Sequence, residues 1–356
     1  MSAIDEGRVL SALSTIVDPD FRRDVVSLGM IKDLNVEDGV VSFTFELTTP
    51  ACPVKDRFQA LAEERLKALP GVSAVRIRMT SNVRRSRRLG EAMLPGVRQT
   101  IAVASGKGGV GKSTVAVNLA AGLGLTGARV GLLDADIYGP SVPAMVGTDA
   151  QPAIRGEKLV PVEVFGVRVM SIGLLAGGDR AMIWRGPMVS RAIQQMLGDV
   201  TWGELDYLVI DLPPGTGDAS LTLAQQVPLT GVAIVCTPQE VALQIAVKAL
   251  RMFRQLNVPI LGLIENMSWY RCPRCGHEAH VFAHDGARRA AARLDVPFLG
   301  AVPLDEGIRE EADAGVPVVV ARPASPGASA FREVVSRVAA RAAVLADREL
   351  PAISVR

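Results

Sequence analysis

The sequence predicts an α/β protein in which a small α+β domain precedes a doubly wound, mostly parallel sheet. From residue 100 onward, short apolar segments rich in β-branched residues alternate with segments of helical periodicity. That order is typical of parallel strands buried under helices on both faces. A glycine-rich turn between the first strand and the first helix adds the arrangement of a phosphate-binding loop. The predicted strands are 100–104, 130–133, 207–210, 232–236, 260–264 and 298–302.

The first 80 residues are expected to form a separate small domain. Helical spacing, strand alternation and turn residues predict the order helix, hairpin, helix and strand, which is typical of a compact α+β domain. The predicted elements are helices over 9–16 and 54–69, a hairpin over 25–47 that turns at Glu37-Asp38-Gly39, and a strand over 74–79.

A basic linker is expected over 81–97, followed by the α/β domain over 98–346 and a tail over 347–356. The linker carries the run Arg84-Arg85-Ser86-Arg87-Arg88. A solvated tether is the favoured interpretation of this run, and a patch for an acidic partner or nucleic acid is the alternative. Within the second domain, 151–178 is less regular, and we expect an insertion or an extra strand pair there.

Composition limits the function classes. The chain has 356 residues, 49% of them hydrophobic, and a net charge of +2. No apolar run approaches the roughly 20 residues of a membrane-spanning helix. A net charge near zero gives no global electrostatic case for nucleic acid. The charged residues among the first ten, with no apolar core between them, predict a cytoplasmic protein without a secretory signal. We therefore expect neither membrane nor nucleic acid as a partner.

The glycine-rich turn is the strongest chemical signal in the chain. It reads Gly106-Lys107-Gly108-Gly109-Val110-Gly111-Lys112-Ser113-Thr114. Its glycines let backbone N–H groups surround a phosphate chain without interference from side chains. Lys112 is placed to reach the terminal phosphates, and the Ser113 hydroxyl to bind Mg²⁺. ATP and Mg²⁺ are the expected ligands of the whole segment.

Lys107 narrows that prediction. The phosphate-loop pattern does not require a lysine there, and lysine is scarce in this arginine-rich chain. A second phosphate-seeking cation is favoured over a solvent-facing side chain. The pattern Lys-Gly-Gly-x-Gly-Lys-Ser/Thr resembles the deviant Walker A motif of the MinD/ParA/nitrogenase-iron-protein class. In that class the first lysine reaches the partner's nucleotide, so the resemblance implies an ATP-dependent homodimer.

Carboxylates follow two of the predicted strands. Asp134 and Asp136 come after 130–133, and Asp136 is expected to orient the attacking water or hold Mg²⁺ through water. The alternative is that either aspartate caps a turn. Asp211 ends a Walker B strand and is expected to bind the Mg²⁺ shell. The proline- and glycine-rich segment after it is typical of a switch loop in which the Gly215 amide senses the γ-phosphate.

Two loop motifs are less specific. Asn266 follows another predicted strand, where it is expected either to pair with the adenine edge or to stabilise its own turn. Residues alone leave both roles open. The segment Trp184-Arg185-Gly186-Pro187 suggests no mechanism beyond a loop with an aromatic anchor.

Cys272 and Cys275 form a C-x-x-C motif, which places two thiolates where one metal or cluster can hold both. The histidines His277, His280 and His284 follow closely, so a single-chain Cys₂His₂ zinc site is possible. A zinc ribbon needs a second C-x-x-C, which this chain lacks. A thioredoxin-like pair is disfavoured, because the flanking proline and glycine favour a knuckle turn.

The remaining interpretation is a cluster shared between two chains, because four thiolates ligate an iron–sulfur cluster. We favour it, since Lys107 already implies a dimer; a plain turn with unligated thiols is the last alternative. Of the other cysteines, Cys52 precedes a helix that would stabilise its thiolate, although an inert small hydrophobe is favoured. Cys236 ends an apolar strand and is expected in the core.

Together these motifs resemble the Mrp/ApbC (Nbp-type) iron–sulfur cluster carrier ATPases over 97–345. Residues 1–80 resemble the SufT/PaaD-like domain often fused to them. The segments that carry the resemblance are 106–114, 134–141, 184–188, 211–218, 265–268 and 272–275, with Thr48-Thr49-Pro50-Ala51-Cys52-Pro53 in the first domain.

The resemblance implies a homodimer that binds and hydrolyses ATP. It implies a labile four-iron four-sulfur cluster bridging the subunits through Cys272 and Cys275 of each. Apo iron–sulfur client proteins and an assembly scaffold would be the partners. Asn266 gains support as an adenine contact, and the switch segments around Asp136 and Gly215 are expected to couple nucleotide to cluster. The implied catalytic residues are Lys107, Lys112, Asp136 and Asp211, with Ser113 on Mg²⁺.

Two rival classes share parts of this pattern. A MinD/ParA-like positioning ATPase with a structural zinc knuckle would use the same phosphate loop. Its membrane contact would be the amphipathic helix expected over 331–345, for which packing on the sheet is the favoured alternative. The second rival is a zinc-stabilised metabolic ATPase or kinase-like enzyme.

Overall fold

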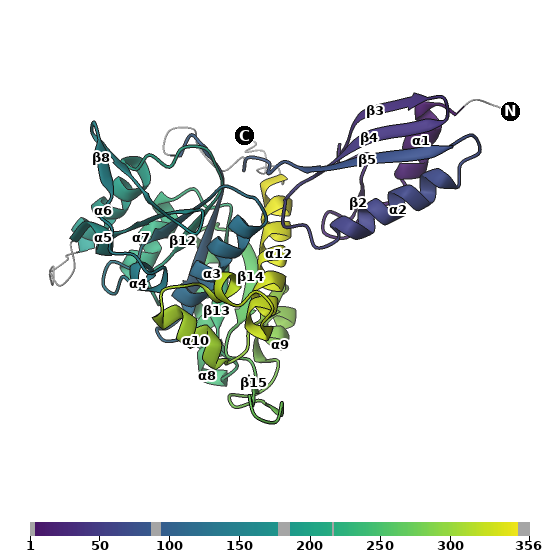
Figure 1. The fold of residues 1–356 in the computed structure, drawn as a ribbon. Helices are drawn as coiled ribbons and strands as arrows, with labels where there is room; N and C mark the ends of the chain where they lie inside the picture. The colour runs from purple at the N-terminus through teal and green to yellow at the C-terminus, as the bar shows by residue number, and fades with distance from the viewer. Residues whose placement is uncertain (1–3, 87–93, 177–185, 216, 348–356) are drawn as a thin grey trace, which may run out of the picture. The chain divides into compact units, whose positions relative to one another are not determined.

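The computed structural model describes residues 4–86, 94–176, 186–215 and 217–347. The chain divides into two compact units. The first holds the residues up to Arg84 together with Ala339–Val344, and the second holds the rest. Figure 1 gives the element labels used below.

The first unit is a three-stranded sheet with two helices. The strand order is β3-β4-β5, in which β3 and β4 are antiparallel and β4 and β5 are parallel. The predicted order of helix, hairpin, helix and strand is confirmed, and a short β1–β2 pair lies between the first helix and the hairpin. The elements are α1 (Glu6–Leu13), β1 (Val17–Asp18), β2 (Arg23–Asp24), β3 (Ile31–Glu37), β4 (Val40–Leu47), α2 (Lys55–Lys67) and β5 (Ala74–Ser81).

Local chemistry explains these elements. The Asp5 side chain accepts the Arg8 N–H at 2.8 Å and so caps α1. The hairpin turns at Asp38 and Gly39 with φ of 48° and 77°, the two left-handed residues that a tight hairpin turn needs. Phe45 of β4 stacks on Phe58 of α2 with ring centroids 5.5 Å apart, which fixes the helix on the inner face of the sheet.

The second unit is built on an eight-stranded sheet among the described residues. Its order is β10-β11-β7-β12-β6-β13-β14-β17. All neighbours are parallel except the edge pair β10–β11, so the sheet is mixed but mostly parallel. The strands are β6 (Val97–Ser105), β7 (Val130–Asp134), β10 (Val162–Val164), β11 (Val167–Ser171), β12 (Leu205–Asp211), β13 (Gly231–Cys236), β14 (Ile260–Glu265) and β17 (Phe298–Ala301).

An insertion or an extra strand pair was expected over 151–178, and the described part of this segment contains two antiparallel strand pairs. It holds the hairpin of β8 (Ala153–Arg155) and β9 (Lys158–Val160), followed by β10 and β11. The remaining strands, β15 (Tyr270–Arg271) and β16 (Glu278–Ala279), form a separate pair. The helices are α3 (Lys112–Leu125), α4 (Val142–Met145), α5 (Ile172–Ala176), α6 (Gly186–Gly198), α7 (Asp218–Gln226), α8 (Glu240–Gln255), α9 (Gly286–Arg293), α10 (Glu306–Asp313), α11 (Val318–Ala321) and α12 (Pro326–Asp347).

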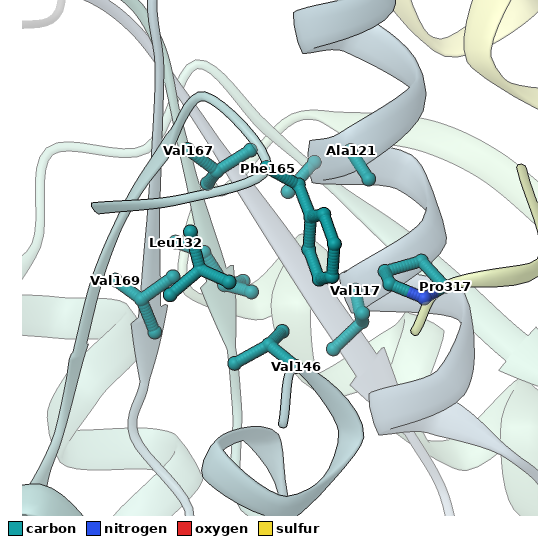
Figure 2. Close-up of a pocket in the computed structure, with 10 residues that line it drawn as sticks. Val117, Ala121, Leu132, Val146, Phe165, Val167, Val169 and Pro317 are labelled. Carbon is teal, nitrogen blue, oxygen red and sulfur yellow. The ribbon is translucent and has the colours of Figure 1, made fainter. Parts of the chain in front are cut away.

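Helix α3, which follows the phosphate loop, is held on two sides. Figure 2 shows Val117 and Ala121 of α3 and Leu132 of β7 lining one small apolar pocket, with the Phe165 ring between them. Against α12, the helix comes so close that a Cβ added at Gly122 would lie 2.6 Å from Val335 Cγ2. This packing fixes the start of α3, and therefore the loop before it.

The amphipathic face of the last helix is buried. The apolar residues predicted on it lie inside the protein, so the packed-helix alternative is confirmed and the membrane-surface alternative is wrong. They are Phe331, Val334, Val335, Val338, Ala342 and Leu345. Among the described residues, no helix combines the length and hydropathy needed to span a membrane.

Candidate functional site

The phosphate loop joins β6 to α3 at the carboxyl edge of the sheet. Gly109 and Gly111 adopt left-handed conformations, with φ of 76° and 80°. A Cβ added at Gly108 or Gly109 would meet nothing within 4 Å, so this face of the loop is open. A Cβ at Gly106 would lie 2.7 Å from the backbone of Ile245 in α8. The loop is thus packed on one side and open on the other, as a cradle for an anion requires.

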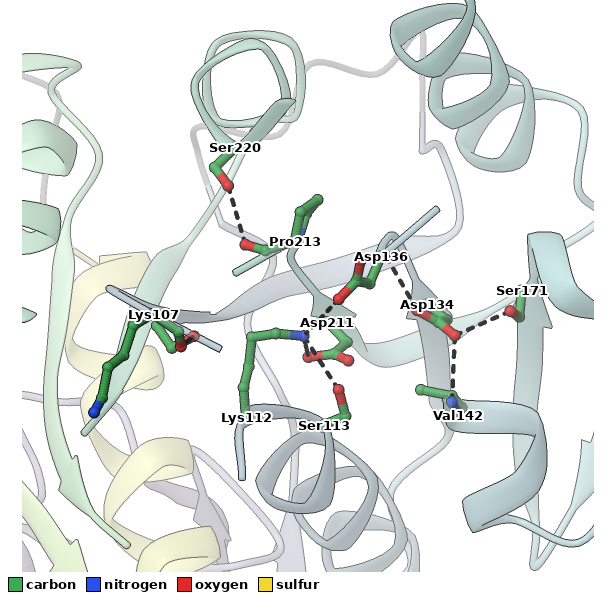
Figure 3. Close-up of polar contacts among 11 residues, drawn as sticks. Lys107, Lys112, Ser113, Asp134, Asp136, Val142, Ser171, Asp211, Pro213 and Ser220 are labelled. Carbon is green, nitrogen blue, oxygen red and sulfur yellow. Dashed lines mark hydrogen bonds and ion pairs between the residues drawn. The ribbon is translucent and has the colours of Figure 1, made fainter. Parts of the chain in front are cut away.

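A buried ion pair lies beneath the loop (Figure 3). Lys112 Nζ is 2.6 Å from Asp211 Oδ1, 3.2 Å from Ser113 Oγ and 3.9 Å from Asp136 Oδ2. The Lys112 and Asp211 side chains are 6% and 0% exposed. Burial raises the pKa of Asp211, and the Lys112 charge opposes that rise. The structure therefore brings together four of the predicted site residues.

One oxygen of this pair is unused. Asp211 Oδ2 is buried and has no hydrogen-bond partner among the residues that the structure describes. A buried carboxylate oxygen without a partner is costly, and a metal-bound water is the kind of donor that would satisfy it.

Asp134 makes more hydrogen bonds in the site than its position in the sequence suggested. Its Oδ1 accepts the Asp136 N–H at 3.1 Å, and its Oδ2 accepts the Ser171 hydroxyl at 3.0 Å and the Val142 N–H at 3.3 Å. Burial, and secondarily the Asp211 charge, raise the pKa of Asp134 to about 7. Asp134 therefore ties the turn that carries Asp136 to β11 and to the start of α4.

Asp136 itself is partly buried, and burial raises its pKa against the pull of Lys112. Ser171 was missed by the sequence reasoning. Its only signal was its place at the end of an apolar segment within the irregular region.

Lys107 lies apart from this cluster. Its side chain is exposed, and Figure 3 shows it directed away from Lys112 and Asp211. Only its backbone takes part locally, because its carbonyl accepts the Ser105 hydroxyl at 2.9 Å. The structure does not bring Lys107 to the site of its own chain.

The Gly215 amide is engaged by the phosphate-loop strand. It donates to the Ser105 carbonyl at 2.9 Å, and Gly215 has a φ of 90°. The Ser220 hydroxyl donates to the Pro213 carbonyl at 3.0 Å and so ties the same loop to α7. Gly215 therefore lies beside the P-loop, and its phosphate-sensing role stays a prediction.

Asn266 reaches the phosphate loop directly. Its Nδ2 donates to the Val110 carbonyl at 2.9 Å, and the side chain is buried. Its amide thus bonds a segment 156 residues away rather than its own turn, so the turn-stabilising alternative is wrong. The adenine contact stays a prediction.

The C-x-x-C motif forms a knuckle between β15 and β16. The Cys272 N–H donates to the His277 carbonyl and the Gly276 N–H to the Cys272 carbonyl, both at 2.9 Å. The backbone N–H groups of Cys275 and Arg274, and then the Cys275 thiol, lower the pKa of Cys272. Cys272 is partly buried and Cys275 is exposed. The knuckle geometry expected from the flanking proline and glycine is confirmed.

The histidines do not complete a metal site around the two thiols. His280 and His284 contact each other, with Nδ1 atoms 3.3 Å apart, and His284 Nε2 lies 3.0 Å from Asp285 Oδ2. The structure describes every cysteine and histidine of the chain. Among the described residues, no group of three or more His, Cys, Asp or Glu side chains is arranged to hold a metal. The described residues therefore give the single-chain Cys₂His₂ alternative no support, and what the two thiols hold stays a prediction.

Of the other two cysteines, Cys52 is partly buried and Cys236 is fully buried. Burial raises the pKa of Cys52 to about 11, against a weaker opposing bond from the Val54 N–H. The raised pKa agrees with the favoured interpretation of Cys52 as a small hydrophobe and disagrees with the alternative, in which the following helix stabilises its thiolate. Cys236 is buried, which raises its pKa as well, and its predicted core position is confirmed.

Part of the basic run is occupied by backbone contacts. Arg84 Nη2 donates to the Leu28 carbonyl at 2.6 Å within the first unit. Arg85 Nη1 donates to the Pro95 carbonyl at 2.7 Å within the second. Arg87, Arg88, Trp184 and Arg185 lie outside the described residues.

Comparison with known proteins decides the family. The family model described as NUBPL iron-transfer P-loop NTPase matches residues 96–339, and that described as iron-sulfur cluster assembly protein matches residues 6–78. An iron-sulfur cluster carrier protein of Deinococcus radiodurans is 47% identical over 345 residues, which cover 96% of this chain and 97% of that one. The chain belongs to the Mrp/ApbC-type family of iron–sulfur cluster carrier P-loop NTPases.

Solved structures agree with the fold. A nucleotide-binding protein from Archaeoglobus fulgidus, solved in complex with ADP, is 41% identical and aligns with a TM-score of 0.57 over 63% of this chain and 88% of that chain. The cell division ATPase MinD from Pyrococcus furiosus aligns with a TM-score of 0.51 at 23% identity over 67% of this chain and 98% of its own. The second unit is thus a carrier-family P-loop NTPase with the MinD/ParA-like fold, as predicted.

Proposed function

We propose that this carrier-family protein is an ATP-hydrolysing homodimer that holds a four-iron four-sulfur cluster between its subunits and transfers it to apo-proteins. Cys272 and Cys275 of each chain would supply the four thiolates. The observation that carries this proposal is the knuckle itself. The exposed thiol of Cys275 and the partly buried thiol of Cys272, whose pKa is lowered, have no third protein ligand among the described residues of the same chain.

A second chain is the simplest source of the missing ligands. Lys107 supports the same dimer, because its side chain is exposed and directed away from its own phosphate loop. In the dimer it would reach the nucleotide of the partner subunit. Client apo-proteins and an assembly scaffold would be further partners, and we expect no membrane or nucleic acid among them.

The nucleotide site fits ATP and Mg²⁺. The open face of Gly108 and Gly109 leaves room for phosphates, and the unused Asp211 Oδ2 suits the shell of a cation. Mg²⁺ would neutralise charge on the phosphates. Ser113 would bind it directly, and Asp211 through water. Lys112 would exchange its bond with Asp211 for one with the nucleotide.

Asp136 is placed to hold the attacking water, because it lies beside Lys112 on a turn fixed by Asp134.

Carriage of a labile cluster also suits a reducing compartment. None of the four cysteines, all within the described residues, is in a disulfide. A cytoplasmic location is part of this proposal. The matches at 6–78 and 96–339 support the division into domains at 1–80 and 98–346, with a linker over 81–97 and a tail over 347–356.

The rival classes have less support. A positioning ATPase that lies on a membrane would need an exposed apolar helix face, but that of α12 is buried. A structural zinc knuckle would need two more ligands near Cys272 and Cys275, and the described residues of this chain do not supply them.

Anaerobic purification followed by iron, sulfide and zinc analysis tests the proposal. We expect about four irons and four sulfides per dimer. Cys272→Ala should lose them while it still binds nucleotide, and Cys52→Ala is the matched control that should keep them. Lys112→Ala should lose nucleotide binding. Stoichiometric zinc that reconstitution cannot replace with a cluster would contradict the proposal.

A further inference from the structure

The cysteine knuckle belongs to one excursion from the sheet, residues 266–286, which we call the cysteine excursion. It leaves at the end of β14 and returns at α9, and Figure 1 shows it at the label β15. Glu265, the last residue of β14, is fully buried. Its Oε1 accepts the Ser268 hydroxyl at 2.5 Å and its Oε2 accepts the Ala287 N–H at 2.6 Å. One carboxylate therefore ties the beginning of the excursion to the residue that follows its end.

The first residues of the cysteine excursion also contact the phosphate loop. Asn266 Nδ2 donates to the Val110 carbonyl at 2.9 Å, while the Asn266 N–H donates to the Cys236 carbonyl at 2.8 Å. A Cβ added at Gly111 would lie 2.1 Å from Asn266 Nδ2 and 4.0 Å from Met267 Cε. The first two residues of the excursion thus lie against the loop that is expected to hold the phosphates.

The two switch segments have no comparable link. Asp136 is bonded through its N–H to Asp134 and lies near Lys112, and the Gly215 N–H is bonded to Ser105. Within the described part of the chain, no hydrogen bond or ion pair joins Asp136 or Gly215 to residues 266–286. The shortest bonded route from the phosphate loop to the cysteines runs through Asn266.

We propose that Glu265 and Asn266 transmit the nucleotide state of the phosphate loop to the cysteine excursion. Phosphates held by the loop amides would change the Val110 peptide, to which Asn266 is bonded. Because Glu265 ties both ends of the excursion, a shift at Asn266 would move residues 266–286 together and change how Cys272 and Cys275 meet those of the partner subunit. The consequence for cluster release rests on the proposed function, whereas the movement itself does not.

Hydrogen exchange on the cluster-free, full-length protein tests the link. Exchange of 266–287 is compared with and without Mg²⁺ and a slowly hydrolysed ATP analogue at a concentration that saturates each variant. The wild type should change its exchange in this segment. Asn266→Ala should lose that change while its nucleotide affinity falls by no more than about tenfold, the effect of one hydrogen bond.

Glu265→Gln keeps the shape of the side chain but weakens its hydrogen bonds with Ser268 and Ala287. This variant should also lose most of the nucleotide-dependent change in exchange. If Asn266→Ala fails to bind nucleotide or to fold, the result with Glu265→Gln decides whether the link exists. The matched control is Glu278→Gln, an exposed glutamate on the same excursion, which should respond as the wild type does.

In the cluster-loaded protein, the ratio of transfer rates with and without ATP should fall to about one in both Asn266→Ala and Glu265→Gln. The link is wrong if the wild type shows no exchange change over 266–287, or if both variants keep it. Because the exchange experiment needs no cluster, a failure of the proposed function is read separately, from the iron and sulfide analysis.

Discussion

Removal of the buried cation from the Lys112–Asp211 pair should destabilise the second unit even without nucleotide. Lys112→Met keeps much of the side-chain volume but removes the charge. Asp211 is fully buried, is 2.6 Å from Lys112, and has one oxygen without a partner among the described residues. Breaking a buried pair of this kind costs about 3–5 kcal/mol, because one charge is left uncompensated.

The loss should depend on pH with a definite sign. Burial already raises the pKa of Asp211, and Lys112 is the main group that opposes the rise. In the variant the folded-state pKa therefore lies still further above the unfolded value of 3.8. A carboxyl whose pKa is raised on folding destabilises the native state above its folded pKa, and the penalty disappears as pH falls towards the unfolded value. Lys112→Met should thus recover stability, relative to wild type, on acidification.

Urea unfolding of the nucleotide-free protein, followed by circular dichroism across pH 5–8, measures both effects. The double variant Lys112→Met/Asp211→Asn removes both charges and should recover most of the loss. Lys158→Met is the matched control, because the Lys158–Asp199 pair is 3.3 Å long but about half exposed, and it should cost less than about 1 kcal/mol. A Lys112→Met variant as stable as this control, or a double variant that shows the sum of two losses, would refute the reasoning.

Three further predictions follow from the site. In the cluster-free protein at pH 8, iodoacetamide should label Cys272 much faster than Cys52. A pKa of about 11 leaves Cys52 about 100-fold less thiolate than a thiol of pKa 9, and the pKa of Cys272 is lowered from that value. Equal labelling rates would contradict this prediction. Gly111→Ala should lose nucleotide binding and at least about 1–2 kcal/mol of stability, because Gly111 has a left-handed φ and an added Cβ would clash with Asn266. Gly108→Ala should keep its stability, because an added Cβ there meets open space. Ser171→Ala should lower the free energy of unfolding in urea by about 1–3 kcal/mol, and by more at pH 8 than at pH 5. The reason is that the lost hydrogen bond stabilises the ionised form of Asp134, whose pKa is about 7. A loss of stability that does not depend on pH would rule out that bond as the cause.

The sheet was predictable because its central strands are buried on both faces. Strands such as 207–210 and 232–236 therefore appear as continuous apolar runs, and the structure extends the first by three residues and the second by one. The hairpin at Asp38 and Gly39 was predictable for a different reason, since few residues accept the left-handed turn. The strands β10 and β11 were predicted only as a possible extra strand pair within 151–178, without bounds, because β10 has three residues and pairs at the edge of the sheet.

The phosphate loop was predictable because its residues are contiguous. The contacts that give the site its shape are not contiguous. Ser171 and Asp134 meet across neighbouring strands, and Asn266 and Val110 meet from segments 156 residues apart. Cys52 shows why a local rule alone is not enough, because its burial outweighs the effect of the helix that follows it. The helix after it does contribute an opposing N–H bond, yet desolvation raises the pKa of the thiol to about 11.

The design of the cysteine knuckle suits a cargo that must leave. A resident metal is held by a full ligand set within one fold, which makes release slow. Here one chain offers two thiols on a short exposed hairpin, and the N–H groups of Arg274 and Cys275 keep Cys272 ready to ligate by lowering its pKa. Under the proposed function the set is complete only while two chains meet, so opening the dimer by a small amount halves the ligands at once. Release then requires no unfolding of the knuckle, only a change in how residues 266–286 of the two subunits approach each other. Glu265 and Asn266 are the residues through which the phosphate loop would make that change.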